Sequence, residues 1–128
     1  MRRVSTAMVM ANGLATIYRR WGSGRTVLLL GINRDARDAL AVALSPSFRV
    51  IVPNVPLLVS DLGAAAWLGG VYDGLGIDAA TIVTTPVLAD AAFQLRQDAP
   101  DRVNAVLITD FARPDIAWLR QAIERAFS

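Results

Sequence analysis

An almost entirely apolar run, Thr26 to Leu30 (TVLLL), is the feature of this sequence that most limits the fold. A strand of this kind needs cover on both of its faces, as the inner strands of a parallel sheet have. Runs of similar length and character recur at Phe48 to Val52, Ala80 to Thr84 and Val103 to Thr109. We therefore expect a mostly parallel sheet that lies between two layers of helices.

Segments with helical periodicity separate these runs. Their apolar side chains recur every three to four residues, and the expected helices cover Asp35 to Leu44, Leu62 to Leu75, Pro86 to Gln97 and Pro114 to Phe127. Alternating strands and helices indicate right-handed crossover units and the α/β class. Ahead of them, residues 6–11 and 14–20 form an expected antiparallel hairpin, because Asn12-Gly13 suits a tight turn. Residues 1–128 contain no long linker, which predicts a single domain.

The composition argues against several classes of function. Histidine and cysteine are both absent, so these residues offer no imidazole base, no thiolate ligand and no disulfide. All 13 basic residues are arginine, but they are scattered and the net charge is only +2, so we expect no nucleic-acid partner. No apolar run reaches the roughly 18 residues of a membrane span, and the start is not typical of a signal peptide. We expect a cytoplasmic protein with no cofactor and no metal site.

The glycines do not form a phosphate-binding motif. Gly22-Ser23-Gly24 precedes a strand, and Gly31 stands alone after one, so both are interpreted as structural turns. Gly70 and Gly74 are four residues apart on the expected helix 62–75. Outside a membrane, this spacing predicts close packing of the helix against a neighbouring element.

The order of the elements resembles the N-terminal half of the α/β-hydrolase family over essentially the whole chain. The resemblance rests on four stretches: IYRRWGSGRTVLLLG (17–31), SPSFRVIVPNVP (45–56), GIDAATIV (76–83) and QLRQDAPDRVNAVLITD (94–110). In the same order, they look like the family's second and third strands, its next strand with the following loop, the strand that leads to the nucleophile, and the helix and strand after the nucleophile. The resemblance implies a truncated hydrolase-like fold without the lid and last strands of the family.

The positions that carry chemistry in that family are altered here. The family's nucleophile elbow, G-x-S-x-G, corresponds to residues 84–88 and places Pro86 at the nucleophile position. Proline carries no reactive group and cannot adopt the positive φ of an elbow. Leu30 replaces the histidine that usually opens the oxyanion loop, and Asp110, where some members keep their acid, has no histidine to orient. From the resemblance we predict a degenerate, non-catalytic hydrolase that is not an enzyme.

The residues at this junction also have an ordinary structural interpretation. Thr85 is a suitable N-cap, whose hydroxyl would accept a backbone N–H, and Pro86 suits the first helical position. We therefore predict a relaxed helix start at this place.

Two alternatives concern a ligand or another chemistry. The family's D-x-P-G-x-G-x-S loop corresponds to residues 54–61, where Leu57 and Val59 replace both glycines. Leu57, Leu58 and Val87 would then line a small apolar ligand pocket. The second alternative is an enzyme of the hydrolase class that uses carboxylates, with candidates Asp35, Asp61, Asp90 and Asp110.

The first interpretation is a structural or interaction subunit of an assembly. In the family, the strand at 103–109 is an inner strand, so a chain that ends soon after it would expose an apolar edge. We expect this edge to pair with a second copy of the chain or with another subunit, and association with a membrane complex stays open. The predicted interface residues are Val106, Ile108, Trp118 and Phe127, although the last helix could equally pack into the core of a monomer.

Overall fold

A computed structural model describes residues 4–31, 34–56, 63–109 and 116–127 of the chain. The strands are β1 (Val4–Ala11), β2 (Leu14–Trp21), β3 (Arg25–Leu30), β4 (Phe48–Pro53), β5 (Ala80–Thr84) and β6 (Val103–Ile108). The helices are α1 (Arg34–Leu44), α3 (Ala64–Leu75), α4 (Pro86–Asp98) and α5 (Ile116–Ala126), with a short 3-10 turn at Pro100–Arg102. Strands and helices alternate after the hairpin, as the sequence predicts.

The strands form one sheet in the order β1-β2-β4-β3-β5-β6. The strands β4, β3, β5 and β6 run parallel, whereas β1 pairs antiparallel with β2, and β2 antiparallel with β4. The predicted α/β class, with a mostly parallel sheet and an N-terminal hairpin, is confirmed. The hairpin is longer than predicted because the β1 register extends to Val4, which pairs with Trp21. Its turn is formed by Asn12 and Gly13, both at positive φ.

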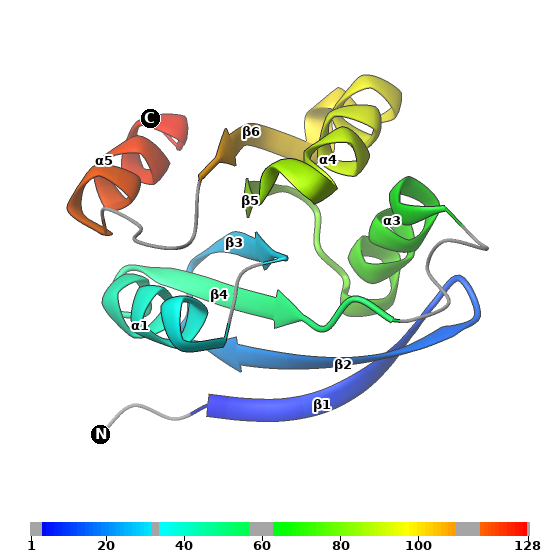
Figure 1. The fold of residues 1–128 in the computed structure, drawn as a ribbon, viewed down its shortest axis with the longest axis horizontal. Helices are drawn as coiled ribbons and strands as arrows, with labels where there is room; N and C mark the ends of the chain where they lie inside the picture. The colour runs from blue at the N-terminus through cyan, green and yellow to red at the C-terminus, as the bar shows by residue number, and fades with distance from the viewer. Residues whose placement is uncertain (1–3, 32–33, 57–62, 110–115, 128) are drawn as a thin grey trace.

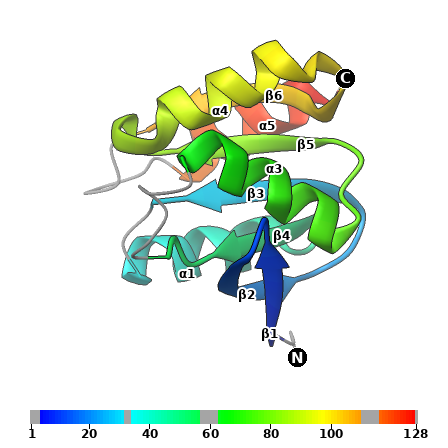
Figure 2. The same ribbon diagram turned by 90° about the vertical axis from the view of Figure 1, so that its right-hand side faces the viewer.

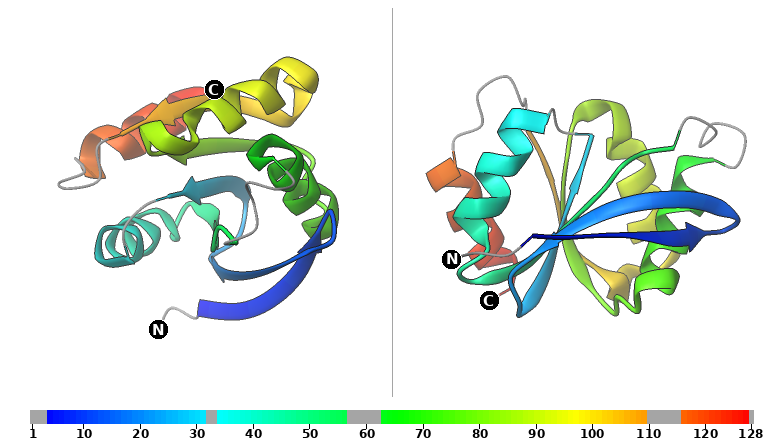
Figure 3. Two further views of the ribbon diagram at one scale, coloured as in Figure 1. Left: turned by 45° about the vertical axis from the view of Figure 1, so that its right-hand side comes forward. Right: turned by 90° about the horizontal axis from the view of Figure 1, so that it is seen from below.

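Helices cover both faces of the sheet (Figure 1). The helices α1 and α5 lie on one face, and α3 and α4 lie on the other, as the turned views also show (Figures 2 and 3). Side chains of β3 alternate between the two layers: Leu28 and Leu30 belong to the α3/α4 core, and Val27 and Leu29 to the α1/α5 core. This alternation explains why the run TVLLL is apolar on both faces.

The helix α3 packs closely on the N-terminal hairpin. A Cβ added at Gly70 would lie 2.6 Å from the Asn12 backbone nitrogen, so only glycine permits this approach. Nearby, the buried Trp67 indole donates a hydrogen bond of 2.9 Å to the Thr16 hydroxyl. The close packing expected from Gly70 is thus present, and the neighbour is the hairpin turn.

Candidate functional site

The junction between β5 and α4 lies at the carboxyl end of the parallel strands, where the resemblance places a nucleophile. β5 ends at Thr84, and Pro86 is the first residue of α4. Thr85 between them has φ −74° and ψ 160°, which is ordinary extended backbone. Among the described residues, Asn12 alone has a positive φ without being glycine. The relaxed helix start predicted for Pro86 is therefore confirmed.

The predicted hydrogen bond of the Thr85 side chain is wrong. Its hydroxyl caps no backbone N–H of α4; the Thr85 carbonyl instead accepts the Leu88 N–H at 3.2 Å. The side chain lies against Gly31, where an added Cβ would come within 2.5 Å of the Thr85 hydroxyl oxygen. The Thr85 N–H donates to the Leu30 carbonyl at 3.2 Å. Leu30 and Gly31, at the end of β3, therefore contact the start of α4, and the Thr85 hydroxyl faces Gly31.

The other residues predicted near this end of the sheet are separated. Leu30 is buried at the end of β3 within the α3/α4 core. Val87 is 88% exposed and lines a hollow of about 500 Å³ between the first turns of α3 and α4, together with Asp90. Leu57, Leu58 and Asp110 lie outside the described residues, as do Val59, Asp61 and the Asp35 side chain. The small apolar pocket of Leu57, Leu58 and Val87 stays a prediction.

The predicted interface residues lie in two different environments. Val106 is partly buried against the α3/α4 core, and Ile108, at the end of β6, is 44% exposed. Trp118 on α5 is 52% exposed. Phe127 packs inside the chain, where its ring stacks on Phe48 with 5.7 Å between ring centroids. Leu119 and Ile123 of the same helix are fully buried, so α5 uses one face for the core of this chain.

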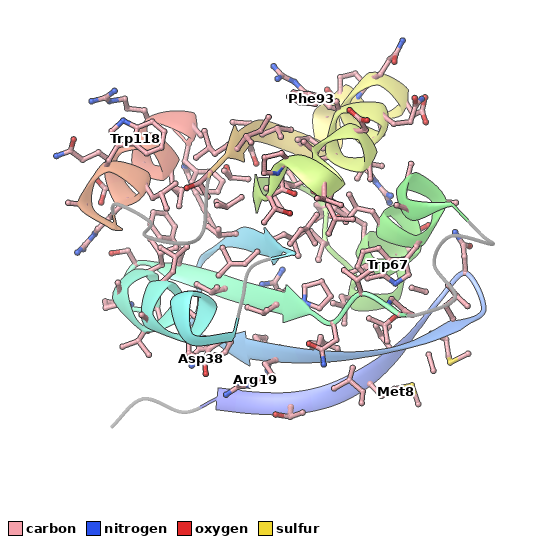
Figure 4. All side chains as sticks on the ribbon, in the orientation of Figure 1. Met8, Arg19, Asp38, Trp67, Phe93 and Trp118 are labelled. Atoms are coloured by element: carbon pink, nitrogen blue, oxygen red, sulfur yellow. The ribbon has the colours of Figure 1, made fainter. Side chains whose placement is uncertain are left out.

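Some exposed apolar side chains were missed by the sequence analysis. Phe93 on α4 is 43% exposed, and α4 and α5 both contact β6 (Figure 4). On the hairpin, Met8, Met10 and Ile17 are each more than half exposed, and Met8 pairs with Ile17. The alternation of apolar and polar residues in β1 and β2 could have revealed the second group, but the exposure of Phe93 depends on how α4 packs.

One titratable group is strongly perturbed. Burial raises the pKa of the Tyr72 phenol, and the nearby Arg102 guanidinium opposes this shift. The Arg102 guanidinium carbon lies 5.6 Å from the centre of the Tyr72 ring. The Tyr72 hydroxyl is buried and has no hydrogen-bond partner in the described part of the chain. A phenol in this state stays neutral at physiological pH and serves packing.

The described ranges contain neither a metal-binding cluster nor a membrane-spanning helix. No group of three carboxylates there could hold a metal ion. No helix among those residues is long and apolar enough to cross a membrane.

Comparison with known proteins identifies the fold. No protein-family model and no curated protein matches the sequence. Among solved structures, the epoxide hydrolase of Vigna radiata superposes with a TM-score of 0.70 at 20% identity, over 82% of this chain and 39% of that one. The chain has an α/β-hydrolase-like fold. The epoxide hydrolase CorEH matches with a TM-score of 0.72 at 23% identity, over 84% and 42% of the two chains. A laboratory-evolved potato epoxide hydrolase matches with a TM-score of 0.71 at 21% identity, over 83% of this chain and 39% of that one.

These matches confirm the resemblance and correct one prediction. The chain spans about two-fifths of the length of these hydrolases. The prediction that the chain is not an enzyme is wrong, because the named structures that share its fold are enzymes, the epoxide hydrolases. Pro86 removes a nucleophile from one position, and this local argument does not extend to the whole chain.

Proposed function

We propose that this chain is a sheet-forming subunit of a hydrolase-type assembly, in which a further polypeptide segment pairs with the outer edge of β6. The observation that carries the proposal is the character of that edge. β6 ends the sheet among the described residues, and its sequence VNAVLI contains no charged residue. Soluble proteins usually protect such an edge with charges, proline or a covering element.

The surroundings of β6 support pairing with another segment. The helices α4 and α5 contact β6 from opposite faces of the sheet and leave its outer edge between them. Phe93 on α4 and Trp118 on α5 add exposed aromatic surface on the two sides (Figure 4). A paired strand would add backbone hydrogen bonds along β6, and the aromatic rings would add apolar contact area.

The partial match with the epoxide hydrolases supports the same arrangement. More than half of each named hydrolase has no counterpart in this chain. Histidine is absent from the 128 residues, so an imidazole base would have to come from the added segment. Hydrolysis of an epoxide is then a property of the assembly, and this chain contributes the sheet that positions the reacting groups.

The test is the assembly state of the chain and of two lysine variants. Multi-angle light scattering of the wild type should give a mass above the 13.7 kDa of one chain, or a second subunit should co-purify with it. Ile108→Lys should abolish the assembly, because it places a charge on the β6 edge. Val87→Lys, at an exposed apolar position away from β6, is the matched control and should assemble normally.

Activity provides a second readout. The purified assembly should hydrolyse an epoxide, and the Ile108→Lys monomer should not. A wild-type chain that stays monomeric at every concentration and brings no subunit with it from its native cells would contradict the proposal. Normal assembly of the Ile108→Lys variant would also contradict the proposal.

A further inference from the structure

A cavity of about 660 Å³ lies at the opposite end of the sheet from the β5–α4 junction. It is lined by the first residues of the parallel strands, including Arg25 of β3, Arg49 of β4 and Asn104 of β6. Asp78, just before β5, and Phe127, just after α5, also line it. The cavity therefore brings two guanidinium groups and one amide to the amino ends of neighbouring strands.

Arg49 is held in place by a neutral partner. Its Nε and Nη2 atoms donate hydrogen bonds of 3.0 and 2.7 Å to the hydroxyl of Thr26, which is buried on the neighbouring strand. Thr26 and Arg49 are partners in the β3–β4 register, so the sheet itself sets this arrangement. The hydroxyl orients the guanidinium but does not neutralise it, and three of its five N–H groups stay available.

Arg25 is oriented in a similar way. Its Nη1 atom donates to the Phe127 carbonyl oxygen, and its guanidinium carbon lies 5.3 Å from the centre of the Phe127 ring. Both contacts fix the side chain through groups that carry no net charge. These contacts therefore leave the positive charge of Arg25 without a compensating negative group among the residues named here.

Some other arginines of the described chain have a charged partner instead. Three of them pair with carboxylates: Arg19 with Asp38 at 3.0 Å, Arg102 with Asp73 at 2.5 Å, and Arg120 with Glu124 at 3.5 Å. Within the described ranges, neither Arg25 nor Arg49 has a carboxylate within ion-pair distance, although both are held by hydrogen bonds. Oriented, uncompensated guanidinium groups in a cavity are typical of oxyanion recognition.

We propose that this cavity binds a small molecule through a single carboxylate or phosphate group held by Arg49, while Arg25, which leaves the sheet on the opposite face, adds positive charge at the cavity wall. The Asn104 amide can donate a further hydrogen bond to the same group or to a neighbouring oxygen. The Asp78 carboxylate repels additional negative charge, so the site favours ligands with one anionic group. Asn104 lies near the start of β6, whereas Ile108 lies at its end, and the test of the cavity does not depend on assembly.

Titration followed by NMR chemical shifts tests this proposal, with inorganic phosphate and acetate as separate probes. Low ionic strength is needed because salt screens the partly exposed arginines, and sodium chloride serves as the reference anion. We expect saturable shifts at the cavity residues with at least one probe. Binding of phosphate alone would assign a phosphate ester, binding of acetate alone a carboxylate, and binding of both a general oxyanion site.

Matched variants separate the cavity from general charge effects. Arg49→Gln should weaken the binding at least tenfold, whereas Arg96→Gln, an exposed arginine of α4 outside the cavity, should change it less than twofold. Asp78→Asn removes the repelling carboxylate and should tighten binding severalfold, and it keeps the proposal testable if Arg49→Gln does not fold. No saturable shift with either probe, equal effects of the two arginine variants, or weaker binding by Asp78→Asn would overturn the proposal.

Discussion

Replacing Gly70 by alanine should destabilise the protein, whereas the same change at Gly69 should stabilise it. Both glycines lie within α3, where alanine is favoured over glycine by about 0.5 to 1 kcal/mol. At Gly69 an added Cβ meets only the Leu95 side chain, at 4.0 Å. At Gly70 it would lie 2.6 Å from the Asn12 nitrogen and 2.7 Å from the Ala11 carbonyl carbon.

The size of the effect follows from these distances. Non-bonded carbon atoms prefer about 3.5 to 4.0 Å, so α3 and the hairpin turn would have to separate by about 1 Å. The clashing atoms belong to the backbone, and no rotamer change can relieve them. Overpacking of this kind costs about 1 to 3 kcal/mol. The helix-propensity gain is common to both variants, so the difference in free energy of unfolding between them should equal this packing cost.

Urea unfolding followed by tryptophan fluorescence measures that difference. Gly69→Ala should unfold at a higher urea midpoint than the wild type, and Gly70→Ala at a midpoint well below that of Gly69→Ala, with similar slopes. Equal stability of the two variants would refute the close approach of α3 to the hairpin turn.

Further predictions concern the buried polar groups of the α3 layer. Thr16→Val should lower the free energy of unfolding by about 1 to 3 kcal/mol, because the buried Trp67 indole N–H loses its acceptor. Urea unfolding measures this change, and an unchanged free energy of unfolding would mean that water replaces the hydroxyl. Tyr72→Phe should be neutral or slightly stabilising at pH 7, since it removes a buried hydroxyl that has no partner among the described residues. Because burial raises the pKa of Tyr72, the wild type should lose stability as the pH rises above about 10, where the unfolded phenol ionises first. Tyr72→Phe should show a weaker loss in the same range, and identical pH profiles would contradict this cause.

Much of the fold could be predicted because the decisive signals are local. Asn12-Gly13 favours a tight hairpin turn through backbone conformation alone, and both residues have the expected positive φ. Pro86 has a fixed φ and no N–H, which suits a helix start, and α4 begins there. The two-sided burial of β3 follows from its own apolar residues.

The candidate site was less predictable because its contacts join distant parts of the chain. The Thr85 hydroxyl faces Gly31, a residue 54 positions earlier, so a capping rule based on neighbours failed. Phe127 was assigned to an interface, but in the structure its ring stacks on Phe48. The inference of a non-enzyme was drawn from Pro86 and from the absence of histidine, and the comparison with hydrolases overturned it.

By itself, the sequence determined the α/β class, the hairpin and the absence of a nucleophile at position 86, since each depends on local periodicity or on the chemistry of one side chain. The tertiary structure alone decided that Arg25 and Arg49 line one cavity and that α4 and α5, which carry the exposed Phe93 and Trp118, both pack on β6. The reason is geometric: a parallel sheet gathers the ends of strands that are far apart in sequence, and no local pattern records which side chains then meet.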